Sequence, residues 1–138
     1  MKRNEHELDV ESSSLRASWL EAVDALLRTI RHWLDRAVRE GLAKIDIASV
    51  HVPEDAVGAY DAPALKITLP GRRTVWVRPV GTLCVGGRGI VDVVSGSSRA
   101  LLVLNRAGIW KIRASGPSSA LVPLDENEFA RALTELIL

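Results

Sequence analysis

Residues 64–80, ALKITLPGRRTVWVRPV, decide the fold class. Apolar and polar residues alternate in 64–69 and again in 74–78, which is the period of a strand with one face in a core. PGRR at 70–73 is a tight turn between the two runs. Strands joined by such a short connection pair antiparallel, because parallel pairing needs a crossover of a dozen or more residues.

Further strands are expected on both sides of this hairpin. KIDIASVHV at 44–52 alternates in the same way, and TLCVGG at 82–87 and GIVDVVSG at 89–96 are more continuously apolar. RALLVLNR at 99–106 and GIWKIRAS at 108–115 follow, and NRAG at 105–108 is typical of a hairpin turn. The chain is therefore expected to form a meander of about six to seven short strands, in a strongly bent sheet or partial barrel.

A helix is predicted at each end of the sheet. Residues 15–40 have helical periodicity, with the serines at 12–14 as candidate caps and Gly41 as the stop. Residues 123–138 form the second helix, which Asp125 can cap. We predict one α+β domain over residues 1–138, with residues 1–11 as a frayed polar tail.

The first helix carries a broad apolar stripe. At 1.5 Å per residue the helix is roughly 39 Å long, close to or beyond the span of such a domain. Either the sheet covers the stripe completely or part of it is left for another chain. Because aromatic residues are enriched at interface centres, we predict a homodimer through this stripe. The predicted dimer interface comprises Trp19, Val23, Leu26, Ile30 and Trp33.

The polar sides of the predicted strands are basic. In residues 62–118 the only acidic residue is Asp92, and alternation puts Trp76 on the same side of its strand as Arg78. Such a face is typical of a surface that binds an acidic or amphipathic protein segment, or alternatively single-stranded nucleic acid. It is also compatible with a solvated face, or one that the acidic helices neutralise. The candidate binding residues are Trp76, Arg78, Lys66, Lys111, Arg113 and Arg99.

The composition of the chain bears on its possible partners and location. A net charge of +1 gives no global electrostatic case for a nucleic-acid or membrane partner. No stretch approaches the ~20 apolar residues of a membrane span, and the N-terminus lacks the apolar run of a secretory signal. The single cysteine, Cys84, lies in an apolar stretch typical of a buried thiol. We therefore expect a cytoplasmic protein with no membrane partner.

Catalytic motifs are weak. HVPEDAVGAYDAPALK at 51–66 could gather a divalent cation, but Ala64 stands where a nuclease motif has an acid two residues before its lysine. The glycines of GGRG at 86–89 lack the spacing of a phosphate loop. We therefore expect no cofactor and a non-catalytic interaction module; a metal-dependent hydrolase or nuclease is the distant alternative. Its residues would be His51, Asp55, Asp61 and Lys66.

The burial of Trp76 distinguishes two interpretations of the basic face, a covered face and a ligand-binding face. If Val75 and Val77 face the core, a buried Trp76 would mean that a helix or second chain covers the polar side. An exposed Trp76 would favour a ligand-binding face. Pro79 cannot donate a ladder hydrogen bond, so the strand is expected to end there or to lie at an edge.

Overall fold

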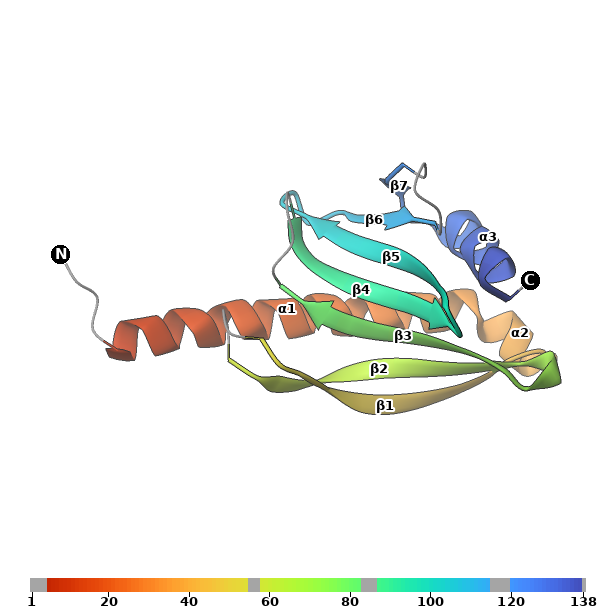
Figure 1. The fold of residues 1–138 in the computed structure, drawn as a ribbon, viewed down its shortest axis with the longest axis horizontal. Coiled ribbons are helices and arrows are strands. Elements are labelled where there is room, and N and C mark those ends of the chain that lie inside the picture. The colour runs from red at the N-terminus through yellow and green to blue at the C-terminus, as the bar shows by residue number, and fades with distance from the viewer. Residues whose placement is uncertain (1–4, 55–57, 83–86, 115–119, 138) are drawn as a thin grey trace.

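In the computed structural model, two longer helices pack on one face of a seven-stranded antiparallel sheet (Figure 1). The structure describes residues 5–54, 58–82, 87–114 and 120–137. The strands follow one another in the sheet in the order of the sequence, β1 to β7. β1 and β7 are its two edges, so the sheet stays open rather than closing into a barrel. The predicted α+β fold, a helix, a bent antiparallel meander and a second helix, is confirmed.

The N-terminal helix starts earlier than the sequence indicated. α1 spans Glu5–Trp33, so the serines at 12–14 lie inside it and do not cap it. Residues 5–11, expected as a frayed tail, are its first turns, and they extend beyond the sheet in Figure 1. A separate short helix, α2, spans Asp35–Arg39. Gly41 ends it as predicted, with a φ of 74° and a hydrogen bond from Leu42 N to Ala37 O of 2.8 Å.

The strands agree with the alternation for most of the sheet. β1 (Lys44–Val52), β2 (Tyr60–Leu69) and β3 (Arg73–Gly81) come first, with the short helix η1 (Pro70–Arg72) at the predicted tight turn. β4 (Gly87–Ser95), β5 (Ser98–Asn105) and β6 (Trp110–Arg113) follow. The turn before β6 is closed by Asn105 Oδ1, which accepts a hydrogen bond from Ile109 N at 2.9 Å.

Two predicted boundaries were wrong or fall outside the described residues. Of the strand expected at 82–87, residues 83–86 lie outside the described part of the chain and Thr82 is a bend. The seventh strand is instead β7 (Val122–Pro123), which pairs with β6 and which alternation did not reveal because it has two residues. α3 (Glu126–Ile137) begins at its predicted cap, where Asp125 Oδ1 accepts the Glu128 N–H at 2.8 Å.

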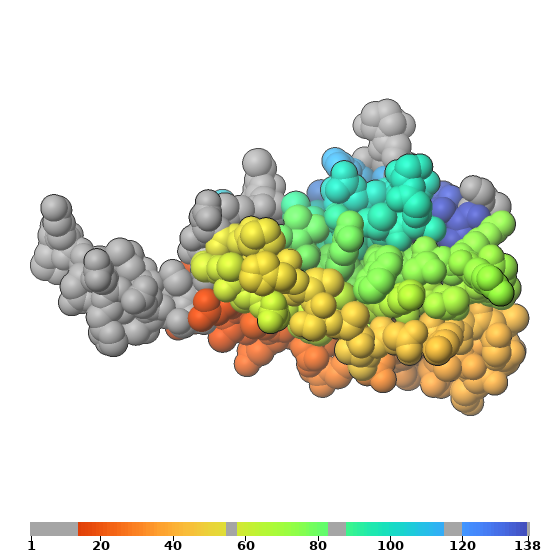
Figure 2. Space-filling view, turned by 60° about the horizontal axis from the view of Figure 1, so that its bottom comes forward, coloured from red at the N-terminus to blue at the C-terminus, as the bar shows by residue number. Residues whose placement is uncertain are grey.

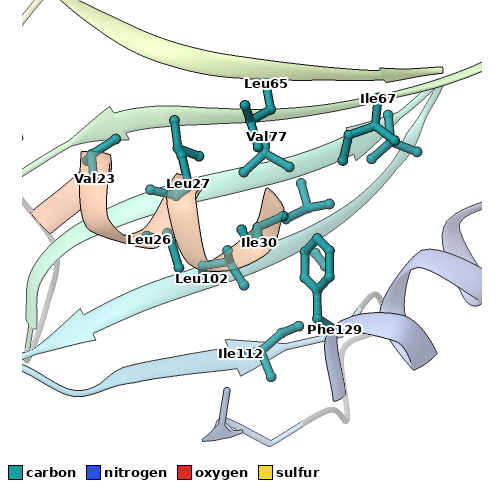
Figure 3. Packing of buried hydrophobic residues seen from close by; sticks show 14 of the residues in the cluster. Val23, Leu26, Leu27, Ile30, Leu65, Ile67, Val77, Leu102, Ile112 and Phe129 are labelled. Carbon is teal, nitrogen blue, oxygen red and sulfur yellow. The ribbon is translucent and has the colours of Figure 1, made fainter. Parts of the chain in front are cut away.

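The hydrophobic core lies between one face of the sheet and the two longer helices. Figure 3 shows Val23, Leu27 and Ile30 of α1 directed at the strands, with Phe129 of α3 beside them. The inner sheet face supplies the remaining core, including Leu65, Ile67, Val75, Val77, Val91, Val93, Leu102 and Ile112. Burial of this apolar area is the main favourable term in folding.

The β1–β2 ribbon twists, so that one of its faces packs on the core near the turn and the other face does so at the far end. Near the turn, Leu65 and Ile67 of β2 are core residues, whereas at its beginning Tyr60 and Ala62 are. β2 is registered with β3 only as far as the pair Leu65–Val77, and the strands diverge beyond it (Figure 1). Two-stranded ribbons twist more strongly than wide sheets, so the free part of this ribbon presents its other face to the core.

Candidate functional site

The six residues predicted to bind a partner all lie on one side of the sheet, here called the outer face. One cross-strand row runs Lys66, Trp76, Val94, Arg99 through β2 to β5. The next row runs Arg78, Asp92, Leu101, Arg113 through β3 to β6. A third contains Ile90, Val103 and Lys111. Antiparallel register therefore assembles residues that are up to 47 positions apart in the chain.

No described helix covers the outer face. The strand residues that point to the other side of the sheet, such as Val75, Val77 and Val93, are fully buried in the core, to which α1 and α3 also contribute. Trp76 is half-buried and Arg78 is exposed. Trp76 is thus neither fully buried nor exposed, the two arrangements considered for it, and no described helix lies over it.

The centre of the outer face is aliphatic and its periphery is mainly basic, with the exposed Asp46 of β1 opposite Lys66. Ile90, Val94, Leu101 and Val103 are half-buried, and cations lie on both sides of them. The Lys66 ammonium stands 6.0 Å from the Trp76 ring centroid, within the range of a cation–π contact. Arg78, Lys111 and Arg113 form no ion pair with any described residue.

Asp92 is a buried carboxylate in the middle of this basic surface. The residue is 5% exposed, and its Oδ2 is 3.5 Å from Arg99 Nη1, a long ion-pair contact. Its Oδ1 is buried and accepts no hydrogen bond from the described residues. The sequence signal was a lone acid within the apolar run GIVDVVSG, noted only as the single acidic residue of 62–118.

Pro79 lies in the part of β3 that is no longer paired with β2. β3 is an inner strand, but β2 has already left it beyond Val77, so no ladder partner needs an N–H from Pro79 on that side. A register shift between Pro79 and Gly81 follows on the β4 side. The expectation that the strand ends at Pro79 or lies at a sheet edge was therefore wrong: β3 continues to Gly81 as an inner strand, and Pro79 pairs with Val91 of β4.

The helical stripe expected to contact a second copy is instead core. Trp19, Val23, Leu26 and Ile30 are at most 3% exposed because the sheet of the same chain covers them. Trp33 is half-buried, with its ring centroid 5.8 Å from that of Phe129, and it lines a groove of about 270 Å³ with Trp110 and Leu124. Trp19, Val23, Leu26 and Ile30 are therefore not available to a partner in the folded chain, whereas Trp33 is partly exposed.

The residues considered for metal-dependent catalysis do not converge. His51 Nδ1 and Asp61 Oδ1 are 3.1 Å apart on paired strands, both exposed. Lys66 lies about 17 Å along β2 from Asp61, beside Trp76. Asp55 lies outside the described residues. Within the described part of the chain, no three His, Cys, Asp or Glu side chains gather as metal ligands would.

A second buried carboxylate, Glu54, ties the β1–β2 ribbon to the sheet. Glu54 is 8% exposed; its Oε2 accepts the Tyr60 hydroxyl at 2.8 Å and its Oε1 accepts Thr82 N at 2.6 Å. Thr82 Oγ1 donates to the same oxygen. Gly81 leaves room for the carboxyl, because a Cβ there would stand 3.3 Å from Glu54 Cδ. Burial, and then the hydrogen bond to Glu54, raise the pKa of Tyr60 well above its usual value of 10.0.

Comparison with known proteins assigns no function to these residues. Among the described residues, no helix is both long and apolar enough to cross a membrane. Comparison with protein-family models, with curated proteins and with solved structures gave no match.

Proposed function

We propose that the protein is a non-catalytic, cytoplasmic interaction module whose outer face binds an acidic, amphipathic segment of another protein. The observation that supports this is a sheet face that no described helix covers, with an aliphatic centre and three surrounding cations, Arg78, Lys111 and Arg113, that form no ion pair with described residues. A segment with apolar residues on one side and carboxylates beside them would match both parts. Trp76 offers a large and rigid contact next to Arg78, a combination that is enriched at interface centres.

The aliphatic centre favours a protein segment over single-stranded nucleic acid. Sequence-tolerant nucleic-acid binders stack bases on aromatic side chains above a basic groove. On the described outer face Trp76 is the one aromatic residue, and Ile90, Val94, Leu101 and Val103 separate the cations. Such side chains bury apolar surface against a peptide but give bases little to stack on.

Binding should be measured by fluorescence anisotropy with two labelled probes. One is a synthetic amphipathic peptide of leucine and glutamate; the other is a single-stranded oligonucleotide of similar charge. We expect the peptide to bind, and Arg78→Glu to weaken it at least about tenfold through charge repulsion. Arg106→Glu is the matched control, because Arg106 is exposed in the β5–β6 turn and belongs to none of the three rows.

A second variant separates the two partner classes. Leu101→Ser removes apolar surface from the centre without altering charge, so it should weaken the peptide and leave any electrostatic binding of the oligonucleotide unchanged. Oligonucleotide binding that falls steeply with salt, with no peptide binding, would replace the proposal by the nucleic-acid alternative. Failure of both probes to bind would remove the outer face as a site for either.

A further inference from the structure

The two edges of the sheet differ in how they are protected. β7 has two residues, one of them Pro123, so it offers almost no ladder to an added strand. β1 has 9 residues, none of them proline, and pairs with β2 without a register shift. Its outward backbone groups have no strand beside them within the described chain. Proteins that stay monomeric normally shorten, bulge or charge such an edge.

Apolar side chains are left uncovered along this same edge. Ile47 is 62% exposed although Leu65, directly opposite it on β2 and on the same face, is 1% exposed. The inner sheet face therefore continues past the cover of α1 and ends in an exposed isoleucine. Val38 of α2 and Leu42, just before β1, are also exposed, at 39% and 52%. In Figure 2 the gold and yellow surface of β1 crosses the front of the molecule with no described segment over it.

A groove lies between this edge and the helices. It has a volume of about 370 Å³, and Ile45 and Val38 form its apolar part. Arg28 and Asp35 also line it, but they pair with Asp24 and Arg39. The remaining lining residues, Arg31 and His32, form no ion pair with a described residue. An added strand would place inward side chains over this groove.

We propose that the occupant is a second copy of this chain, paired antiparallel along β1 about a two-fold axis at Ile47. Residues 44–50 of the two copies would then face each other, with the two exposed Ile47 side chains directly opposed. This contact is isologous: the same surface serves both partners, as in most homodimers. It extends two seven-stranded sheets into one continuous sheet.

Charge permits a second copy along β1 and disfavours one register. Lys44 and Asp46 cancel within the strand, so two copies do not repel along it. A register centred on Asp46 would oppose two carboxylates and is disfavoured, whereas the Ile47 register sets Asp46 opposite Ala48 of the other copy. Antiparallel pairing also brings the Asp61 end of one copy to the Arg31 and His32 end of the other. This dimer does not rest on the proposed binding function.

The proposal is tested by sedimentation equilibrium of the full chain. At about 100 µM we expect twice the 15.0 kDa mass of the chain, a self-association of moderate affinity. Ile47→Lys places a charge at the centre of the edge and should leave a monomer. Ile109→Lys is the control, because Ile109 is 52% exposed in the β5–β6 turn, away from β1, and its variant should stay dimeric.

Hydrogen exchange on the unmodified protein gives a readout that does not depend on any variant folding. Amides of β1 should exchange more slowly at high than at low protein concentration, while β6 amides should show no such dependence. A wild-type monomer at the stated concentration would overturn the proposal. A dimer that survives Ile47→Lys, with exchange in β1 independent of concentration, would also overturn it.

Discussion

Gly89 of β4 lies directly against the indole ring of Trp19 in α1: a Cβ at position 89 would overlap the ring atoms Cε3, Cζ3 and Cη2. Trp19 cannot easily withdraw, since it is 2% exposed and packs on Trp110 with ring centroids 6.0 Å apart. The close approach of α1 to the sheet at this point therefore requires glycine.

Gly89→Ala is expected to destabilise the fold by about 1–3 kcal/mol, the usual cost of overpacking a core. Urea unfolding followed by circular dichroism measures the change. Combining it with Trp19→Leu, which removes the overlapping ring, should make the two effects clearly non-additive. Additive losses would mean that the ring and Gly89 are not in contact.

Tyr60 is predicted to resist ionisation, and it is the only tyrosine in the chain. Its pKa is raised in the folded state, first by burial and then by the hydrogen bond to Glu54, so the folded protein keeps a proton that the unfolded chain releases. The associated stability is fully present below pH 10 and is lost as the pH rises above that value. Tyrosinate absorbance should appear only together with alkaline unfolding.

Tyr60→Phe is the control for that pH dependence. The variant should unfold more easily at pH 7, by about 1–3 kcal/mol, because Glu54 loses a buried hydrogen-bond donor. Its stability should then fall less between pH 9 and pH 11 than that of the wild type. An unchanged slope would assign the alkaline loss to other groups.

Asp125 is predicted to stabilise α3 through its cap. Asp125→Ala removes the acceptor for Glu128 N and should cost about 0.5–2 kcal/mol. Asn127→Ala is the matched comparison, because Asn127 is exposed in the same first turn without a capping role. Thermal melts of the two variants would show whether the loss is confined to position 125.

The buried Asp92 carboxylate is predicted to lower the stability of the folded protein. Asp92→Leu removes a buried oxygen that accepts no hydrogen bond from described residues, and it should raise the free energy of unfolding by about 1 kcal/mol. If the outer face binds as proposed, the same variant leaves Arg99 without its partner and changes affinity for the acidic peptide. A clear loss of stability would show instead that Asp92 is well paired in solution.

Local patterns predicted most of the sheet and the polarity of its faces. Period-two alternation placed Trp76 opposite Val75 and Val77 correctly, because each strand there has one face in the core. The cap at Asp125 and the stop at Gly41 depend on side-chain and backbone chemistry within a few residues, so they too could be read from the sequence.

Other features depend on contacts between distant parts of the chain. Ala62 is buried because β2 has left β3 and twisted, and no local pattern says where two strands separate. The helix stripe from Trp19 to Trp33 would be apolar whether it packed on the chain's own sheet or on a second copy. Periodicity could therefore not distinguish the two. No local pattern indicates the role of Glu54, because its partners Tyr60 and Thr82 lie 6 and 28 positions away.

The order of elements also has a consequence for synthesis of the chain. Every strand pairs with its sequence neighbours, so each hairpin can form soon after it leaves the ribosome. α1 emerges before the strands, so the surface that buries Val23 and Ile30 is made later than the helix. Until β3 to β5 have been translated, the nascent helix exposes an amphipathic stripe of the kind that chaperones recognise.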